Sequence, residues 1–231
     1  MSTTTGVHPF IYVLLGCPGS GKGTFAQAIK PEGYDHVSTG DITREEVRNE
    51  TEFGLKYKEA ILNHVIGGIP FDEIQKLIDQ RLERAVTEQR GVILDGYPKT
   101  LEQCELLDAF IQKKSLEGRV VFILLNVEEE DAIDRILYRQ SCEKCGKLYN
   151  AKFSPSKIPD ICDSCAGALT KRMDDNSDGT RKRVYEFKEK MQPVIDYYTS
   201  SNRLSVLDGN GSPEVCLERF LSFHQQMQMK V

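Results

Sequence analysis

Five short runs rich in Val, Ile and Leu recur along the 231-residue chain, at residues 10–15, 34–38, 91–95, 120–127 and 203–208. Longer stretches, in which apolar residues follow helical spacing, separate these runs. The apolarity within each run is continuous rather than alternating, which is typical of strands covered on both faces by helices. The pattern therefore predicts an α/β fold with a doubly wound parallel sheet.

Helices are predicted in the intervals, at residues 22–29, 71–88, 100–114, 128–140, 181–200 and 212–228. The last of these has Ser212 as its expected N-cap and Pro213 in its first turn. Two segments interrupt the alternation of strands and helices: a helical one at 41–70 and a polar, cysteine-bearing one at 140–175. Both follow the carboxyl ends of predicted strands, where open α/β sheets bind ligands.

The composition fits a folded soluble enzyme, with 39% hydrophobic and 28% charged residues. A formal net charge of -5 excludes a broad positive surface for nucleic acid or an anionic membrane. The first residues do not resemble a signal peptide, and no apolar run approaches the ~20 residues of a membrane helix. We therefore expect a cytoplasmic protein with no nucleic-acid or membrane partner.

A glycine-rich loop, GCPGSGKGTF, follows the first predicted strand and leads into a helix at residues 16–25. Backbone N–H groups of such a loop converge on phosphate oxygens, while Lys22 reaches the β and γ phosphates of a nucleotide. Gly23 separates Lys22 from the hydroxyl of Thr24, which departs from the plain Walker pattern. This narrower motif resembles that of the nucleoside monophosphate kinases.

Polar clusters also follow the second and third strands. In STGDITR, residues 38–44, Thr39 is suited to binding a base and Arg44 a phosphate. In DGYPKTLEQC, Asp95 occupies the position of a Walker-B carboxylate that holds magnesium through water. Taken singly, the first cluster could be only a helix cap and Asp95 only a turn residue.

Together with the loop, these motifs and those around the cysteines resemble the adenylate kinases in their long-lid form, over nearly the whole chain. The resemblance implies a five-stranded P-loop core at 1–37, 71–139 and 176–231. It adds an insert at 38–70 that binds the nucleoside monophosphate (NMP), and a lid at 140–175. The implied reaction is ATP + AMP ⇌ 2 ADP with magnesium, in a monomer.

The resemblance also assigns roles to individual residues, among them stacking of Arg135 on the ATP adenine and hydrogen bonding of Gln103 to the AMP adenine. Without the family, a solvated salt bridge would be the usual interpretation of Arg135. The implied ATP contacts are Gly19, Ser20, Gly21, Lys22, Gly23, Thr24, Arg135, Arg139, Leu148, Tyr149 and Gly211. The implied AMP contacts are Thr39, Arg44, Gly68, Ile69, Pro70, Gly96, Tyr97, Pro98, Lys99, Gln103, Arg172 and Arg183. The implied catalytic residues are Lys22, Asp95, Lys99, Arg139, Arg172 and Arg183.

The chain departs from the family pattern at two places. Lys99 stands where the family usually has an arginine that grips the AMP phosphate, so the charge is kept but the bidentate geometry is lost. In GGIPFDE, Pro70 is shifted by one position relative to the usual motif. Lys99 leaves a catalytically weakened nucleotide-binding homologue as an alternative. A GTP:AMP kinase or another NMP kinase also remains, because the phosphate-binding residues say little about the donor base.

Four of the seven cysteines form two Cys-x-x-Cys pairs: Cys142, Cys145, Cys162 and Cys165. This spacing favours a tetrahedral structural zinc site over an iron–sulfur site or unliganded thiols. Lysines and aromatic residues between the pairs would suit a nucleic-acid-binding ribbon, but acidic residues flank them. A zinc-bearing lid is therefore preferred. Cys17, Cys104 and Cys216 are expected to be small buried hydrophobes.

Overall fold

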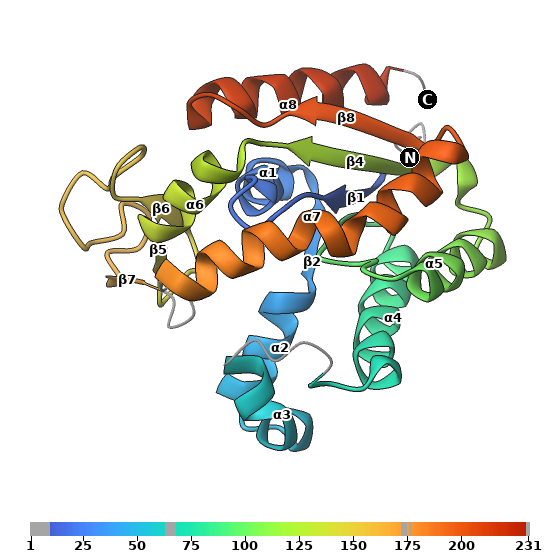
Figure 1. The fold of residues 1–231 in the computed structure, drawn as a ribbon, viewed down its shortest axis with the longest axis horizontal. Coiled ribbons are helices and arrows are strands. Elements are labelled where there is room, and N and C mark those ends of the chain that lie inside the picture. The colour runs from blue at the N-terminus through green and yellow to red at the C-terminus, as the bar shows by residue number, and fades with distance from the viewer. Residues whose placement is uncertain (1–9, 63–67, 172–174, 176, 230–231) are drawn as a thin grey trace, which may run out of the picture.

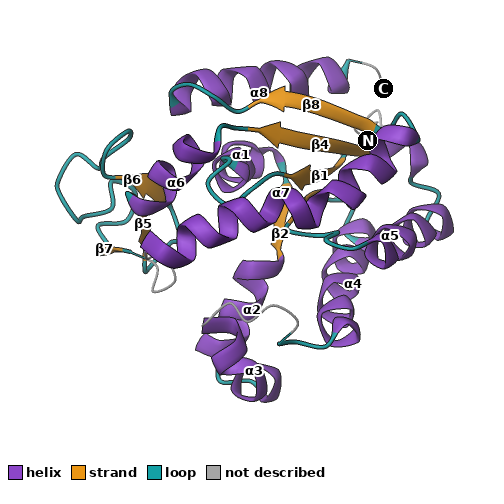
Figure 2. Cartoon of the chain, in the orientation of Figure 1, coloured by secondary structure: helices purple, strands orange, loops and turns teal. Residues whose placement is uncertain are grey.

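The computed structural model describes residues 10–62, 68–171, 175 and 177–229. Its main sheet contains β1 (Ile11–Leu15), β2 (Tyr34–Ser38), β3 (Gly91–Asp95), β4 (Val120–Asn126) and β8 (Leu204–Asp208). The strands lie in the order β2-β3-β1-β4-β8, and all neighbouring pairs are parallel. Figures 1 and 2 show the sheet between two layers of helices, so the predicted doubly wound architecture is confirmed.

Helices α1 (Lys22–Ile29) and α8 (Pro213–Gln228) cover one face of the sheet. The other face carries α4 (Phe71–Thr87), α5 (Leu101–Lys113) and α7 (Ser177–Ser200). Successive strand residues point to opposite faces. Tyr12 accordingly packs with Phe25 and Phe220, whereas Val13 packs with Leu82 and Val194. Burial on both faces explains why the strands lack polar alternation.

Side-chain caps fix the starts of several helices. The Ser212 hydroxyl accepts a hydrogen bond from the Val215 N–H at 3.4 Å, as predicted for the start of α8. The Thr100 hydroxyl accepts one from the Gln103 N–H at 3.2 Å at the start of α5. Each cap satisfies one of the N–H groups that a helix N-terminus leaves without an intrahelical partner. Short 3-10 turns, η1 (Lys30–Glu32) and η2 (Glu117–Arg119), precede β2 and β4.

The segment after β2 forms a separate lobe of two helices, α2 (Thr39–Arg48) and α3 (Glu52–Leu62), seen below the sheet in Figure 1. Gly54 lies where α3 crosses α2, and a side chain there would collide with the main chain of Glu46. Glycine therefore allows the two helices to pack closely. This lobe lies within the predicted insert at 38–70, whose exact bounds stay a prediction.

The segment after α6 (Glu129–Leu137) forms a small antiparallel sheet of β5 (Arg139–Cys142), β6 (Leu148–Asn150) and β7 (Leu169–Thr170), in the order β6-β5-β7. The sequence pattern continued the preceding helix to residue 140, and this prediction was wrong. Residues 139–142 instead pair with β6 and β7, because cross-strand hydrogen bonds outweigh local helix propensity. Arg135 and Arg139 therefore come from different elements.

None of the helices within the described ranges is both long and apolar enough to cross a membrane.

Candidate active site

The loop between β1 and α1 wraps around the ammonium group of Lys22. This group donates hydrogen bonds to the carbonyl oxygens of Gly16 at 2.7 Å and Cys17 at 2.9 Å. Gly19 and Gly21 have φ of 84° and 102°, a left-handed conformation that favours glycine. A Cβ on Gly19 would also collide with the carbonyl of Ala132. The sequence therefore fixes a tight loop whose N–H groups precede a helix N-terminus, as anion binding requires.

Asp95 ends β3 beside this loop. Its carboxylate lies 3.9 Å from the Lys22 ammonium and 3.3 Å from Nε2 of His36 in β2. Burial opposes ionisation of Asp95, but the positive charge of Lys22, the His36 hydrogen bond and Lys99 outweigh it, so its pKa is lowered. Asp95 is therefore an anion near neutral pH.

The next group of site residues lies where β2 and β3 end. The Thr39 hydroxyl donates to the Gly96 carbonyl at 3.1 Å. A Cβ on Gly96, whose φ is 75°, would lie 2.7 Å from that hydroxyl and 3.9 Å from the Lys99 ammonium. Arg44 forms an ion pair with Asp41 at 2.5 Å. The predicted acceptor residues thus gather at the carboxyl edge of the sheet.

Lys99 is exposed as a residue, but its ammonium lies against Gly96 in a cluster of cations. Its pKa is lowered, first because the surrounding protein displaces water and then because Lys22 and Arg44 repel its charge. Asp95 attracts the ammonium and opposes this shift. An anion that entered between these cations would relieve their repulsion.

Two of the predicted AMP contacts, Gln103 and Tyr97, form hydrogen bonds within the protein, and a third, Pro70, bounds a helix. The side-chain oxygen of Gln103 accepts from the Lys99 N–H at 2.6 Å, so a hydrogen bond to an acceptor atom of a ligand would come from its amide nitrogen. The buried Tyr97 hydroxyl has two acceptors for its one proton, the Gln75 side-chain oxygen at 2.7 Å and the Gln103 carbonyl at 3.2 Å. Pro70 is the N-terminal boundary residue of α4. Tyr97 thus holds Gln103 in place rather than pointing its side chain at a substrate.

Asp175 joins two of the predicted catalytic arginines. Its fully buried carboxylate accepts from Nε and Nη2 of Arg139 at 2.8 and 2.6 Å, and from Nη2 of Arg183 at 3.3 Å. Arg139 starts β5 and Arg183 lies on α7, so Asp175 holds together two elements that meet at the base of the lid. The third arginine, Arg172, lies outside the described residues.

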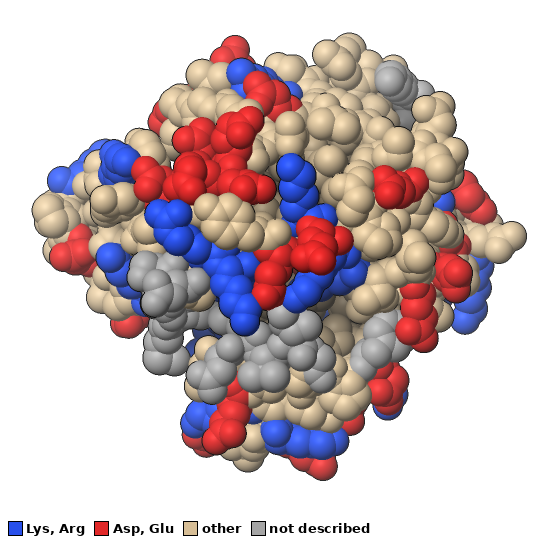
Figure 3. All heavy atoms as spheres, viewed as in Figure 1, with Lys and Arg blue, Asp and Glu red and all other residues tan. Residues whose placement is uncertain are grey.

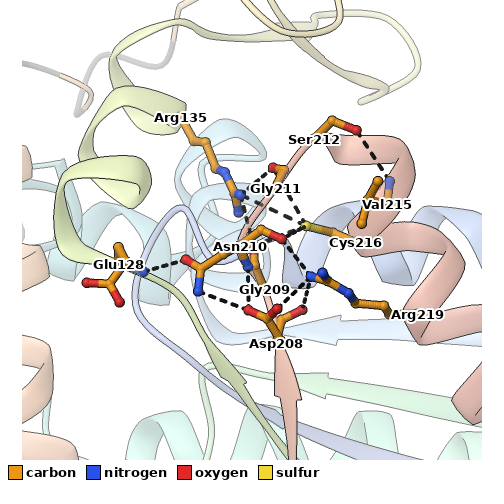
Figure 4. Close-up of polar contacts among 10 residues, drawn as sticks. All are labelled: Glu128, Arg135, Asp208, Gly209, Asn210, Gly211, Ser212, Val215, Cys216 and Arg219. Carbon is orange, nitrogen blue, oxygen red and sulfur yellow. Dashed lines mark hydrogen bonds and ion pairs between the residues drawn. The ribbon is translucent and has the colours of Figure 1, made fainter.

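Arg135 connects α6 to the loop after β8. Figure 4 shows its guanidinium pointing to the carbonyl oxygens of Gly209 and Gly211, at 2.8 and 3.0 Å. Arg219 holds the same loop from α8, bonding the Asn210 carbonyl at 2.6 Å. Two of the predicted ATP contacts, Arg135 and Gly211, are therefore in direct contact.

The four predicted metal ligands also come together. Their sulfur atoms lie within 4.8 Å of one another, with 3.4 Å between Cys142 and Cys165 and 3.6 Å between Cys145 and Cys162. Zn–S bonds of ~2.3 Å in a tetrahedron separate the sulfurs by about 3.8 Å, so these cysteines fit a zinc ion. The other cysteines, Cys17, Cys104 and Cys216, are buried as expected.

The cysteines are presented by two loops of the same design, here called the first knuckle (residues 142–147) and the second knuckle (162–167). In the first, the Gly146 N–H donates to the Cys142 carbonyl at 2.9 Å. In the second, the Ala166 N–H donates to the Cys162 carbonyl at 2.9 Å. Gly146 and Ala166 both have positive φ, of 72° and 54°.

Comparison with known proteins adds an independent observation. The family model for adenylate kinase matches residues 14–203. The chain is 42% identical to the adenylate kinase of Fervidobacterium nodosum over 207 residues, covering 87% of this chain and 91% of that protein. It is 38% identical to that of Caldanaerobacter subterraneus, covering 89% and 92%, and 42% identical to that of Magnetococcus marinus, covering 85% and 91%.

The chain belongs to the adenylate kinase family. Membership makes it a phosphotransferase of the P-loop class, as the sequence predicted. Sequence reasoning missed two residues that contact the predicted site residues, namely His36 beside Asp95 and the buried Asp175 beside Arg139. His36 resembles any polar strand residue in the sequence. The pair of aspartates in RMDDN at the end of the lid was the one signal that pointed to Asp175.

Tyr149 lies in the cysteine cluster. Its hydroxyl is 3.5 Å from the Cys162 sulfur and accepts from the Asp163 N–H at 2.9 Å. The Tyr149 hydrogen bond is the main reason that the pKa of Cys162 is lowered to about 6, which favours the thiolate that zinc requires. The Tyr149 side chain therefore faces the cysteines, and only its main chain would be able to contact ATP. That contact stays a prediction.

The surface charge around the site is local. Figure 3 shows Lys and Arg side chains gathered along α7, between the core and the α2–α3 lobe, with acidic side chains over α6 beside them. The acidic residues of the first turn of α6 are Glu129, Glu130 and Asp131. The positive groups available to a phosphate are thus a confined cluster on an acidic protein, as the net charge implied.

Proposed function

We propose that this protein catalyses the reversible transfer of a phosphoryl group from ATP to AMP, giving two ADP. The observation that carries the proposal is the convergence of Lys22, His36 and Lys99 on Asp95 at the ends of three neighbouring strands, with Arg44 close enough to Lys99 to repel its charge. Phosphoryl transfer needs alignment and positive charge on the equatorial oxygens more than covalent assistance. This cluster supplies both requirements.

Donor and acceptor bind at different places in this proposal. The loop at 16–21 and Lys22 hold the ATP phosphates, and Arg135 with Gly211 borders its base. Thr39, Arg44, Lys99 and Gln103 hold AMP, with residues 68–70 near its base. Arg139, Arg183 and Arg172 surround the transferred group, where a planar guanidinium can bond two oxygens at once. All these residues belong to one chain, so a monomer is sufficient.

Magnesium would be held by Asp95 through water and by the hydroxyl of Thr24 in the first turn of α1. The lowered pKa of Asp95 fits this role, because an ionised carboxylate is the oxygen ligand that magnesium prefers. When bound, the ion neutralises charge on the nucleotide phosphates. The lid over the loop excludes water, which would otherwise hydrolyse ATP.

Zinc is proposed to have a structural role. Four thiolate ligands fill the tetrahedral shell and leave no open position for a substrate. The lid sheet has strands of only two to four residues, so its apolar core is small and a metal clip stabilises it.

A coupled assay that follows ADP formation tests the proposal. ATP with AMP should give ADP in a magnesium-dependent reaction, and Lys22→Met should lower the rate by a factor on the order of 100 or more. Replacing ATP with GTP, and AMP with UMP or CMP, measures the preference at each site. Rates with GTP that exceed those with ATP, or no AMP-dependent turnover, would contradict the assignment.

A further inference from the structure

Gln27 makes a double contact between the phosphate-loop helix and the lid. It lies on α1, which begins at Lys22, and is half-buried. Its side-chain nitrogen donates to the Gly146 carbonyl at 3.1 Å, and its side-chain oxygen accepts from the Leu148 N–H at 3.4 Å. Among the described residues, both hydrogen bonds that join α1 to the lid come from this one side chain.

One of the two lid groups that Gln27 contacts, the Gly146 carbonyl, belongs to the first knuckle, and the other, the Leu148 N–H, directly follows it. Gly146 follows the ligand Cys145 in the first knuckle, and its N–H donates to the carbonyl of the ligand Cys142. The knuckle geometry therefore determines where the Gly146 carbonyl points. Gln27 thus contacts a main-chain group whose position depends on the cysteine cluster.

The same contact brings the lid against the phosphate loop. Leu148 begins β6, and its side chain lies over Gly23, where a Cβ would be only 3.0 Å from the Leu148 methyl. Gly23 directly follows Lys22 in the loop motif. The Gln27 contact therefore sets how closely Leu148 approaches the residues that hold the nucleotide phosphates.

Other bonds attach the lid next to the point where it leaves the core. The Asn150 side chain donates to the Arg135 carbonyl at 3.0 Å, and the Ala151 N–H donates to the Tyr138 carbonyl at 2.8 Å. Both acceptors are at the end of α6, from which the chain runs directly into β5. Gln27 is 119 residues from Gly146 in sequence, so its bonds join the lid to a part of the core other than its point of attachment.

We propose that Gln27 is a positioning residue that docks the first knuckle on α1 and thereby holds the lid over the phosphate loop when ATP binds. The inference rests on the proposed binding of ATP at residues 16–24. Glutamine suits this role because its amide carries a donor and an acceptor that match one carbonyl and one N–H of an extended main chain. Its docking also links the metal site to ATP binding.

The direct test measures MgATP affinity by titration calorimetry in zinc-loaded wild type, Gln27→Met and Gln27→Glu. Methionine keeps the side-chain length and removes both hydrogen bonds, whereas glutamate replaces the donor with an oxygen that faces the Gly146 carbonyl. Two lost hydrogen bonds should weaken MgATP binding about 3- to 10-fold. The KM for AMP should stay the same, because the acceptor residues lie at the ends of β2 and β3.

Gln80→Met is the matched control, since Gln80 is an exposed helical glutamine on α4. It should leave MgATP affinity unchanged, and zinc content should remain one ion per chain in every variant. If Gln27→Met binds MgATP as tightly as wild type, or weakens AMP and ATP equally, the inference is wrong. Because binding needs no turnover, a protein that binds ATP without forming ADP would refute the proposed activity and still test Gln27.

Zinc removal gives a second test of the same inference. If the first knuckle acts on ATP binding through Gln27, stripping zinc and replacing Gln27 remove the same contact. Their effects on MgATP affinity should then be non-additive, with Gln27→Met changing the affinity of metal-free protein less than twofold. If the fold losses in MgATP affinity caused by zinc removal and by Gln27→Met multiply when the two are combined, the metal and Gln27 act independently. That result would contradict the docking role.

Discussion

Lys99 is the residue at which the acceptor site departs most from the family motif. Its ammonium lies against Gly96 and shares the site with Arg44, Lys22 and Asp95. A lysine presents a point charge, whereas arginine presents a planar fork with two parallel donors. Lys99, Lys22 and Arg44 supply positive charge at this site. What Lys99 does not supply is the pair of directional hydrogen bonds that an arginine would form with a phosphate.

We expect Lys99→Arg to improve the use of AMP. A second charge-assisted hydrogen bond to the AMP phosphate should raise kcat/KM for AMP about 3- to 30-fold, with the KM for ATP unchanged. Initial rates at varied AMP and saturating ATP measure this effect, and Lys113→Arg at the end of α5 is a matched surface control. Unchanged AMP affinity and unchanged turnover in Lys99→Arg would show that Lys99 does not contact the acceptor.

The pH dependence of AMP use should differ between these two proteins. The pKa of Lys99 is lowered, so its charged form is lost at a lower pH than that of a free lysine. The kcat/KM for AMP in wild type should therefore fall as pH rises through that lowered pKa. Arginine keeps its charge throughout this range, so Lys99→Arg should retain its activity to higher pH. Parallel profiles from pH 7 to pH 10 would rule out titration of Lys99 as the cause.

The two knuckles differ in the residue at their fifth position. Both need a positive φ at the fifth position, which Gly146 supplies at 72° and Ala166 at 54°. A residue with a Cβ in this conformation costs ~1–2 kcal/mol. The second knuckle therefore carries backbone strain that the first avoids. Exchanging the two residue types, as Gly146→Ala and Ala166→Gly, tests this strain in both directions.

Gly146→Ala should weaken zinc binding, and Ala166→Gly should strengthen it. A Cβ on Gly146 meets no atom within 4 Å, so the conformational strain is the main effect of that change. The expected shift is about 3- to 20-fold in zinc affinity for each variant, in opposite directions. Competition with a chromophoric chelator measures it. Shifts of the same sign would mean that φ strain is not what distinguishes the knuckles.

Removal of zinc should destabilise the lid before the core. The lid sheet depends on four cysteines, whereas the main sheet is buried between two helical layers. Hydrogen exchange of metal-free protein should show lost protection in β5 and β6 with little change in β1 and β4. Equal exchange and equal melting profiles for metal-free and zinc-loaded protein, with metal content confirmed, would refute a structural role for zinc.

The local sequence patterns predicted the helices and strands of the main sheet well, but they did not predict which residues from different elements would contact one another. The strand at 91–95 and the helix at 22–29 were predicted to the residue, because buried strands and a glycine-rich loop leave strong local signals. The lid sheet was missed because strands of two to four polar residues have no readable period. His36 meets Asp95 only because β2 and β3 are neighbours, a consequence of strand order that no single segment encodes.

A buried hydrogen-bond network joins the first strand to the last helix. The Tyr12 hydroxyl in β1 lies 2.6 Å from Nδ1 of His224 in α8, and Nε2 of His224 lies 3.1 Å from a Glu32 oxygen. Tyr12 is fully buried and His224 is 2% exposed. A buried polar group left without its partner costs more than a hydrogen bond gains, so this network links stability to the contact between β1 and α8.

We expect Tyr12→Phe to lower the free energy of unfolding by ~1–3 kcal/mol, because it leaves a buried His224 nitrogen without a partner. Tyr198→Phe is the matched comparison, since the Tyr198 hydroxyl is equally buried but faces the Cys104 thiol, a weak hydrogen-bonding group. That variant should be neutral or stabilising. Urea unfolding of both variants measures the difference, and an equal loss of stability would show that the network contributes no more than the burial of a phenol.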